Sequence, residues 1–403
     1  MNKKITVVVL GLVPFLMVLG NSMLIPEFPA IKKALQINQF QVGLLITFFS
    51  APAAIAIPIL GYLSDRVGRK AIIIPALLIY GAGGAFSGFA AMFMENPYII
   101  ILMGRVVQGL GAAGTGPIAM ALAGDLYKTT ERSESMGILE AANGLGKVLS
   151  PIIGAAVALI IWYALFFSYA ILSIPTALLI WLLVKEPGSQ LQPQPFKKYI
   201  HSILKIFNQK GGALLFNLLG GMVVLFILFG VLSFTSHIIV STFGLTGVAK
   251  GAILSVPLLT LSFTAYLTGL YLRKVNKYFK LAYLVGLLVI AVSMGILPFC
   301  CRSLLVYPIM LGLLGLGSGL VLPSINTMVT SASESEQRGG VTSLYGSVRF
   351  LGVALGPPAF SLMLGPGTFF MFALGGALAL VSGLLGYFMI NEKAILQTGC
   401  RRE

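Results

Sequence analysis

The chain alternates between long apolar runs and short polar gaps. Because a helix needs about 20 apolar residues to cross a bilayer, runs of this length predict membrane-spanning helices. The fifth and sixth runs have almost nothing polar between them, and only their combined length and Trp162 predict a break. The pattern predicts an all-α polytopic protein of twelve spans, near residues 5–26, 41–62, 71–93, 98–123, 136–161, 163–184, 212–234, 251–272, 280–299, 304–329, 340–364 and 366–390.

An internal repeat divides the chain in two. The stretch from Glu131 to Ala155 returns about 206 residues later, and one shift takes Arg132 to Arg338, Gly146 to Gly352, Pro151 to Pro357, Pro117 to Pro323 and Gly111 to Gly317. Such repeats are typical of secondary transporters. We therefore expect two pseudo-symmetric six-helix bundles, at 1–184 and 212–390, with a cytoplasmic linker at 185–211 and a cytoplasmic tail at 391–403.

Composition supports a protein in lipid. With 57% hydrophobic and 10% charged residues, the chain has too little polar surface for a soluble protein of 403 residues. The net charge of +15 does not indicate nucleic-acid binding, because the cations lie in the gaps between apolar runs. Apart from Lys32, Lys33, Lys250 and Arg302, the gap cations occupy alternate gaps and both termini. This asymmetry predicts a cell-membrane protein with both termini in the cytoplasm.

The linker carries a helical pattern of its own. Phe196, Ile200, Ile203 and Phe207 follow helical spacing, while the neighbouring lysines fall outside that stripe. The pattern predicts an amphipathic helix on the anionic inner leaflet. A disordered tether is the alternative.

A charged motif lies between the second and third spans. An acid and three cations surround glycines that permit a tight turn: Gly61, Asp65, Arg66, Gly68, Arg69 and Lys70. This order resembles the loop signature of the major facilitator superfamily. The resemblance implies that the loop braces helices during gating and does not bind substrate. A second, degraded copy runs from Gly269 to Lys277.

Three more stretches resemble the twelve-helix drug:proton antiporters of that superfamily. The first span ends with Leu19-Gly20 and, further on, Pro26 and Pro29, and the fourth contains an arginine motif around Arg105. The fifth span matches the antiporter motif at Gly137, Gly146, Ser150, Pro151 and Gly154, with Ser150 and Ala155 replacing two family glycines. The resemblance implies an exporter. From the residues alone, glycines on a kinked helix also allow ordinary close packing.

Four charged residues lie well inside the expected spans: Arg105, Glu140, Lys147 and Arg349. A charge at this depth is costly, so it is paired, faces water or is functional. Glu140 is the expected proton carrier, because it is the one acid among them. The family resemblance gives Arg105 a part in proton coupling, which physical chemistry allows only indirectly because arginine does not release its proton. A structural ion pair is the alternative for Glu140.

The substrate cavity is expected to contain polar side chains from several spans: Asn21, Gln108, Asn143, Lys147, Tyr345 and Arg349. Many relatives have an acid in the middle of the first span, where this chain has Asn21 and Ser22. Cationic Lys147 and Arg349 favour an anionic or zwitterionic substrate over a lipophilic cation.

These features predict a monomeric, proton-driven exporter of drugs or small metabolites that works by alternating access. Its partners would be its small-molecule substrate, protons and the bilayer. Uptake by a symporter or facilitator, and narrow export of an endogenous metabolite such as a siderophore, remain open. We expect no enzymatic activity and no cofactor beyond the proton gradient, because the two histidines and the intramembrane acid form no cluster. Cys300, Cys301 and Cys400 lack metal-ligand spacing, so we expect no metal site.

Overall fold

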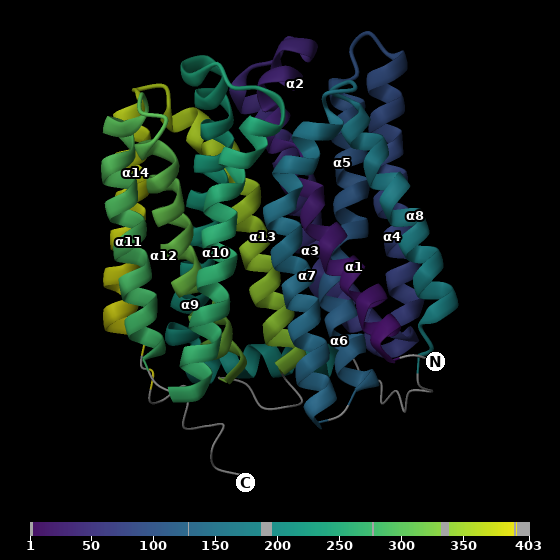
Figure 1. Cartoon of the computed structure of the whole chain (residues 1–403). Helices are drawn as coiled ribbons and strands as arrows, with labels where there is room; N and C mark the ends of the chain where they lie inside the picture. Colours follow the sequence, from purple (N-terminus) through teal and green to yellow (C-terminus); the bar gives the residue numbers. More distant parts are fainter. Residues whose placement is uncertain are drawn as a thin grey trace. The chain divides into compact units, whose positions relative to one another are not determined.

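The computed structural model describes residues 3–127, 129–186, 196–275, 278–331, 338–390 and 392. In this part of the chain the regular structure is helical throughout, as Figure 1 shows. The elements are α1 (Lys3–Ser22), η1 (Ile25–Glu27), α2 (Phe28–Leu35), α3 (Gln39–Val67), α4 (Arg69–Phe93), α5 (Tyr98–Ala113), α6 (Gly116–Leu126), α7 (Thr129–Val157), α8 (Ala164–Leu183), α9 (Phe196–Phe243), α10 (Gly247–Val275), α11 (Phe279–Cys300), α12 (Val306–Ser331), α13 (Arg338–Met363) and α14 (Thr368–Met389).

The predicted all-α polytopic fold is confirmed. Among the described residues, 10 helical segments are long and apolar enough to cross a membrane. The two remaining long helices are α7, with 29 residues, and α13, with 26 residues. These are the helices that contain the intramembrane charges Glu140, Lys147 and Arg349. A long helix that is less apolar than its neighbours is suited to face water within a bundle.

Two connections differ from the expected pattern. The span expected at 98–123 is interrupted between α5 and α6, where Thr115 leaves helical geometry and Pro117 follows at the start of α6. Proline cannot donate the backbone hydrogen bond that would continue the helix. After the first span the chain adds η1 and the short helix α2. The break predicted near Trp162 is confirmed, because α7 ends at Val157 and α8 begins at Ala164.

The predicted linker helix continues directly into the seventh span. Residues from Phe196 onward are helical and form the first part of α9, which is 48 residues long. The side chains that define its amphipathic stripe lie outside the described residues, as do the backbone at 187–195 and, except for Glu392, the tail at 391–403. The position of this helix on the inner leaflet therefore stays a prediction.

The chain divides into two compact units. Unit 1 contains Met1–Pro193 and Gly244–Ser255, and unit 2 contains Gln194–Phe243 and Val256–Glu403. The division thus falls within α10, whose first turns belong to unit 1.

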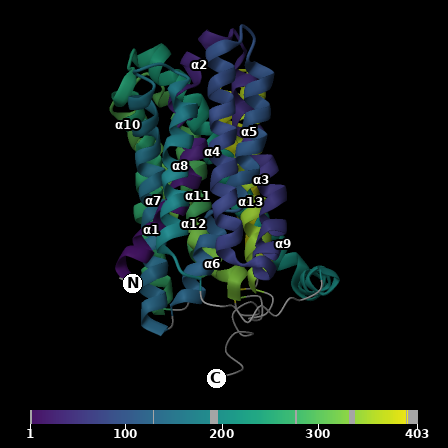
Figure 2. The ribbon, with the colours of Figure 1, turned by 90° about the vertical axis from the view of Figure 1, so that its right-hand side faces the viewer.

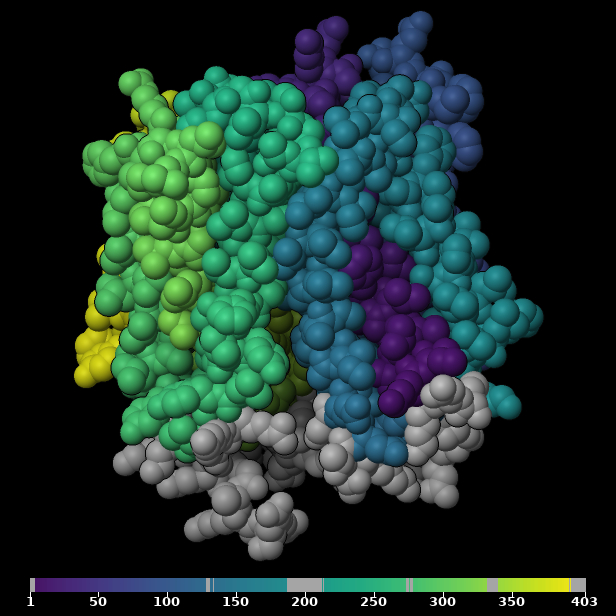
Figure 3. Space-filling view, in the orientation of Figure 1, coloured from purple at the N-terminus to yellow at the C-terminus, as the bar shows by residue number. Residues whose placement is uncertain are grey.

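Corresponding helices pack in the same way inside each unit. In unit 1, α1 packs against α7, and α4 packs against α5 and α8 (Figures 1 and 2). In unit 2, α9 packs against α13, and α11 packs against α12 and α14. In the face of unit 1 seen in Figure 3, α1 (purple) lies between α7 and α8. The packing therefore repeats as the sequence does.

Large apolar side chains are exposed along the helices. Phe93, Ile160 and Trp181 in unit 1, and Phe299 and Phe388 in unit 2, are all more than half exposed. Several buried positions are instead polar, among them Arg105 and Gln108. An apolar exterior around a partly polar interior is the arrangement expected of a multi-pass membrane protein.

Candidate functional site

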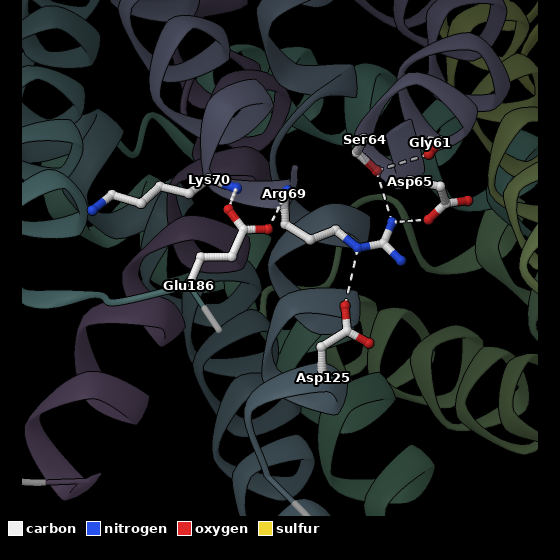
Figure 4. A network of polar contacts seen from close by, with 7 residues as sticks. All are labelled: Gly61, Ser64, Asp65, Arg69, Lys70, Asp125 and Glu186. Atoms are coloured by element: carbon white, nitrogen blue, oxygen red, sulfur yellow. Dashed lines mark hydrogen bonds and ion pairs between the residues drawn. The ribbon is translucent and has the colours of Figure 1, made fainter. Parts of the chain in front are cut away.

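The charged loop between α3 and α4 forms a connected network, shown in Figure 4. Arg69 forms an ion pair with Asp65, donates to Ser64 Oγ at 2.7 Å, and lies 3.2 Å from Asp125 Oδ2 at the end of α6. One guanidinium thus connects three helices. Gly68 has φ +105°, a region that side chains rarely adopt, so the turn between α3 and α4 requires glycine.

A second carboxylate holds the start of α4. Glu186 follows the end of α8 and accepts hydrogen bonds from the backbone N–H groups of Arg69 at 2.6 Å and Lys70 at 3.2 Å. Lys70 Nζ in turn donates to the carbonyl oxygens of Trp181 and Val184 near the end of α8. A carboxylate at a helix N-terminus and a lysine at a helix C-terminus both interact favourably with the helix dipole. This reciprocal contact fixes α4 to α8.

Unit 2 contains the same contact. Glu392 accepts hydrogen bonds from the backbone N–H groups of Phe279 and Lys280, both at 3.2 Å. Lys280 Nζ donates to the carbonyl oxygen of Tyr387 at 2.6 Å. The side chains of Arg273, Lys274 and Lys277 in the predicted copy of the loop lie outside the described residues.

The remaining predicted loop residues are peripheral to the network. Gly61 contributes its carbonyl oxygen, which accepts from Ser64 Oγ at 2.7 Å. Arg66 is exposed, with its guanidinium 4.8 Å from the centre of the Tyr62 ring. The structure therefore brings five of the six predicted residues into or beside one network and directs Arg66 outward.

Arg105 lies at the centre of a buried polar cluster in unit 1. Its guanidinium is fully buried and donates to Leu45 O at 3.0 Å, Gln108 Oε1 at 2.6 Å and Asn21 Oδ1 at 3.2 Å. The Phe49 ring centre lies 4.4 Å from it. Among the described residues no carboxylate pairs with Arg105. Its charge is therefore balanced by oxygen dipoles and an aromatic face.

Asn21 and Gln108 belong to this cluster. Asn21 Nδ2 donates to Ser50 Oγ at 2.8 Å, and both amide side chains are buried. Gln108 Nε2 is buried with no hydrogen-bond partner among the described residues. In this conformation neither side chain is open to solvent, and their place in a substrate cavity stays a prediction.

The polar residues of α7 are more accessible. Glu140 is exposed, while Asn143 and Lys147 are half-buried. Glu140 forms no ion pair with any described residue. A structural ion pair, the alternative considered for Glu140, is thus not present in the described structure. The role of Glu140 as proton carrier stays a prediction.

Small residues of α7 contact α1 closely. A Cβ atom on Gly154 would collide with the Met23 carbonyl oxygen, and one on Gly146 would lie 3.0 Å from the Phe15 carbonyl oxygen. Ser150 is fully buried, with its hydroxyl donating to Lys147 O at 3.2 Å, and Pro151 follows it inside the helix. Gly137 has open space around it. A Cβ atom therefore has no room at Gly154 and little room at Gly146.

Arg349 and Tyr345 lie together on α13. The guanidinium is 5.3 Å from the Tyr345 ring centre, and its Nε is buried with no hydrogen-bond partner among the described residues. Tyr345 is buried, and its hydroxyl donates to Leu322 O at 3.4 Å. The tyrosine ring is fixed, and the arginine beside it is half-buried.

A buried ion pair that the sequence did not indicate joins η1 to α10. Lys250 Nζ lies 2.8 Å from Glu27 Oε1, with the side chains 5% and 8% exposed. Both residues belong to unit 1. The sequence placed Lys250 in a gap between spans, and the structure places it in the first turn of α10, paired with Glu27. Its burial is possible because Glu27 neutralises it.

Nearby contacts fix the first turns of α10 to α7. Ser255 Oγ donates to Val148 O at 2.7 Å, and a Cβ atom on Gly251 would lie 2.5 Å from the Pro151 carbonyl oxygen. Together with the ion pair, these contacts explain why residues 244–255 belong to unit 1.

Among the described residues, no group of three or more His, Cys, Asp or Glu side chains is placed to hold a metal ion. Outside the spans, burial raises the pKa of the Cys301 thiol to about 11. Cys301 is therefore a neutral thiol near pH 7 and a poor nucleophile.

Sequence comparisons agree with these features. The family described as "Major Facilitator Superfamily" matches residues 10–357 and 280–398. The bacillibactin exporter of Bacillus subtilis (strain 168) is 40% identical over 389 residues, covering 96% of each chain. The class B tetracycline resistance protein of Escherichia coli is 23% identical over 357 residues, covering 86% of this chain and 85% of its own length.

A solved structure has the same fold. The crystal structure of a bacterial homologue of the human lysosomal transporter Spinster aligns with a TM-score of 0.79 and 19% identity. The alignment covers 100% of both chains.

Proposed function

Because the chain belongs to the Major Facilitator Superfamily, as its family match and its 40% identical relative show, we propose that it exports a small metabolite in exchange for protons. The family makes it a membrane transporter of small molecules. The observation that carries the narrower proposal is the full-length similarity to a bacillibactin exporter, which covers 96% of both proteins. We therefore propose a siderophore of this type as substrate.

The packing of α7 against α1 supports export by alternating access. Gly146 lies close to Phe15 of α1 and Gly154 lies close to Met23, which directly follows α1. Pro151 lies inside α7 between these two contacts, and a proline inside a helix favours a kink. A repeat architecture with such helices is suited to rocking motions around a midplane site. We propose that the fifth span transmits this motion, as the antiporter motif implies.

Glu140 supports proton coupling. It is exposed on α7 and has no cationic partner among the described residues. This exposed position on a helix that also carries Asn143 and Lys147 supports the proposal that Glu140 is the proton carrier. Arg105, sealed in its buried cluster, takes an indirect role by holding α1, α3 and α5 together.

The proposal also includes the orientation of the chain in the membrane and its monomeric state. The cation asymmetry of the gaps supports cytoplasmic termini in the cell membrane, and each monomer carries its own pathway. No cofactor other than the proton gradient is required.

Inverted membrane vesicles test direction. Vesicles that contain the protein and are acidified inside should accumulate added bacillibactin, and nigericin, which collapses the pH gradient, should abolish accumulation. Accumulation that proceeds without the gradient would contradict proton coupling. Loss of preloaded bacillibactin from the acidified vesicles would instead support the uptake alternative.

A further inference from the structure

The charge balance inside the helices is strongly positive. Glu27 and Lys250 neutralise each other in a buried pair. This pair lies at the ends of helices, and the charges well inside the expected spans are the cations Arg105, Lys147 and Arg349 and the single acid Glu140. Uncompensated charge within a membrane span is costly, and the Arg105 guanidinium is already balanced by polar groups, so it is Arg349 that calls for a negative partner.

Arg349 has no acidic partner among the described residues of unit 2. None of the helices α9 to α14 contains an aspartate or a glutamate. Glu334 and Glu336 precede the start of α13 in the sequence, and Arg349 is 11 positions along that helix, about 16 Å from its start at 1.5 Å per residue. Glu392 is engaged at the start of α11. The described residues of unit 2 thus supply no counter-charge for Arg349.

The face of α13 around Arg349 is polar and accessible. Thr342 is exposed, and Ser343, Gly346, Ser347 and Arg349 are half-buried. Positions 342, 346 and 349 follow one face of the helix, with 343 and 347 beside them. A polar stripe that is accessible in the middle of a span faces water rather than lipid. We therefore expect this face to be reached by a soluble ligand.

The guanidinium also has an unmet hydrogen-bond requirement. Its Nε is buried without a partner among the described residues, while the Tyr345 ring supports one side of the group at 5.3 Å. Tyr345 is itself fixed by its hydrogen bond to Leu322 O and by contact with Gly221. A planar guanidinium presents its donors in a fork that matches the two oxygens of a carboxylate or similar oxyanion.

We infer that Arg349, held by Tyr345, is the anchor for an oxyanionic group on the transported molecule. This inference rests on the proposed transport function and adds the substrate class and the residue that selects it. A bound oxyanion would accept hydrogen bonds from the guanidinium and offset its positive charge. A neutral or cationic analogue would leave both unmet, so the protein would bind it more weakly.

Binding of charge-matched probes tests this inference separately from transport. The full-length protein, purified in detergent, is titrated by calorimetry with 2-naphthoate, 2-naphthamide and 2-naphthylmethylammonium, which share one ring system and differ in charge. Because hydrogen bonds to charged groups are the stronger ones, wild type should bind the naphthoate about tenfold or more tightly than the amide. R349Q should remove this advantage, whereas R349K, which keeps the charge without the planar fork, should retain part of it.

Control variants make the result specific. R302Q removes an exposed arginine between α11 and α12 and should leave the preference for naphthoate unchanged. Y345F, which loses the hydrogen bond to Leu322 O, provides a second test if R349Q fails to fold, and it should weaken naphthoate more than the amide. Size-exclusion chromatography checks that each variant is folded.

Several outcomes would overturn the inference: no binding of the naphthoate, equal binding of naphthoate and amide by wild type, or a naphthoate advantage that survives in R349Q. Failure of the proposed function has a different signature. In that case the oxyanion preference and its dependence on Arg349 would persist, while vesicles would not accumulate bacillibactin.

Discussion

The buried pair of Glu27 and Lys250 yields a quantitative prediction about stability. At their separation of 2.8 Å, two unit charges attract by about 6 kcal/mol at an effective dielectric constant near 20. Burial opposes this attraction with a desolvation cost of several kcal/mol for each ion, so the intact pair contributes little net stability. Removal of one partner leaves the other charge buried alone. We expect K250M or E27Q to cost about 3–5 kcal/mol.

The double variant E27Q/K250M separates this effect from lost packing. With both charges absent, no uncompensated ion remains, and the double variant should be more stable than K250M alone. K33M, which removes an exposed lysine from the nearby α2, should change the free energy of unfolding by less than about 0.5 kcal/mol.

Tryptophan fluorescence during chemical unfolding provides the assay. Both tryptophans of the chain, Trp162 and Trp181, belong to unit 1, which also contains the ion pair. The free energies of unfolding of wild type, E27Q, K250M and E27Q/K250M together give the coupling energy between the two side chains. The reasoning is refuted if each single substitution costs less than about 1 kcal/mol, or if the two single costs simply add in the double variant.

Three further predictions follow from local contacts. E186Q and E392Q weaken the equivalent carboxylate contacts at the N-termini of α4 and α11, so each should lower the free energy of unfolding by about 1 kcal/mol. Equal stability of wild type and both variants would contradict a stabilising role for these contacts. G154A should reduce transport and lower the free energy of unfolding by about 1–3 kcal/mol, because the backbone of Met23 leaves no room for a methyl group. G137A, with open space around it, should behave as wild type, and equal effects of the two substitutions would disprove the close contact. In a variant with the other two cysteines replaced by serine, iodoacetamide should alkylate Cys301 slowly at pH 7. The alkylation rate should rise about tenfold per pH unit until the pH reaches the thiol pKa of about 11. A rate that levels off near pH 8 would contradict the burial of this thiol.

Much of the fold could be predicted from the sequence because the membrane imposes a simple length rule. Apolar runs gave the spans, and the internal shift gave the correspondence between α7 and α13. The same shift takes Glu186 to Glu392, so the second carboxylate contact, at the start of α11, could have been predicted from the first one by the repeat. The break between α5 and α6 was harder to foresee, because the equivalent Pro323 lies inside the continuous helix α12.

The polar contacts depend on tertiary structure and escape sequence patterns. Glu27 and Lys250 are far apart in the chain, and each lies next to the end of an expected span, where charged residues are common. Nothing in the local sequence therefore indicates that they pair. Arg105 was recognised as an intramembrane cation, but its balance by Asn21, Gln108 and a backbone carbonyl required the geometry of three helices.

Proton exchange by purified protein in liposomes tests the central claim most directly. Liposomes with an acidic interior and a trapped pH indicator receive external bacillibactin, and the internal pH is followed for wild type, E140Q and the control E95Q, which alters an exposed glutamate outside the spans. Wild type and E95Q should release protons when bacillibactin is added, and E140Q should not. If E140Q exchanges protons for bacillibactin as wild type does, Glu140 is not the carrier. If wild type produces no proton movement while transporting bacillibactin, proton-driven export is contradicted.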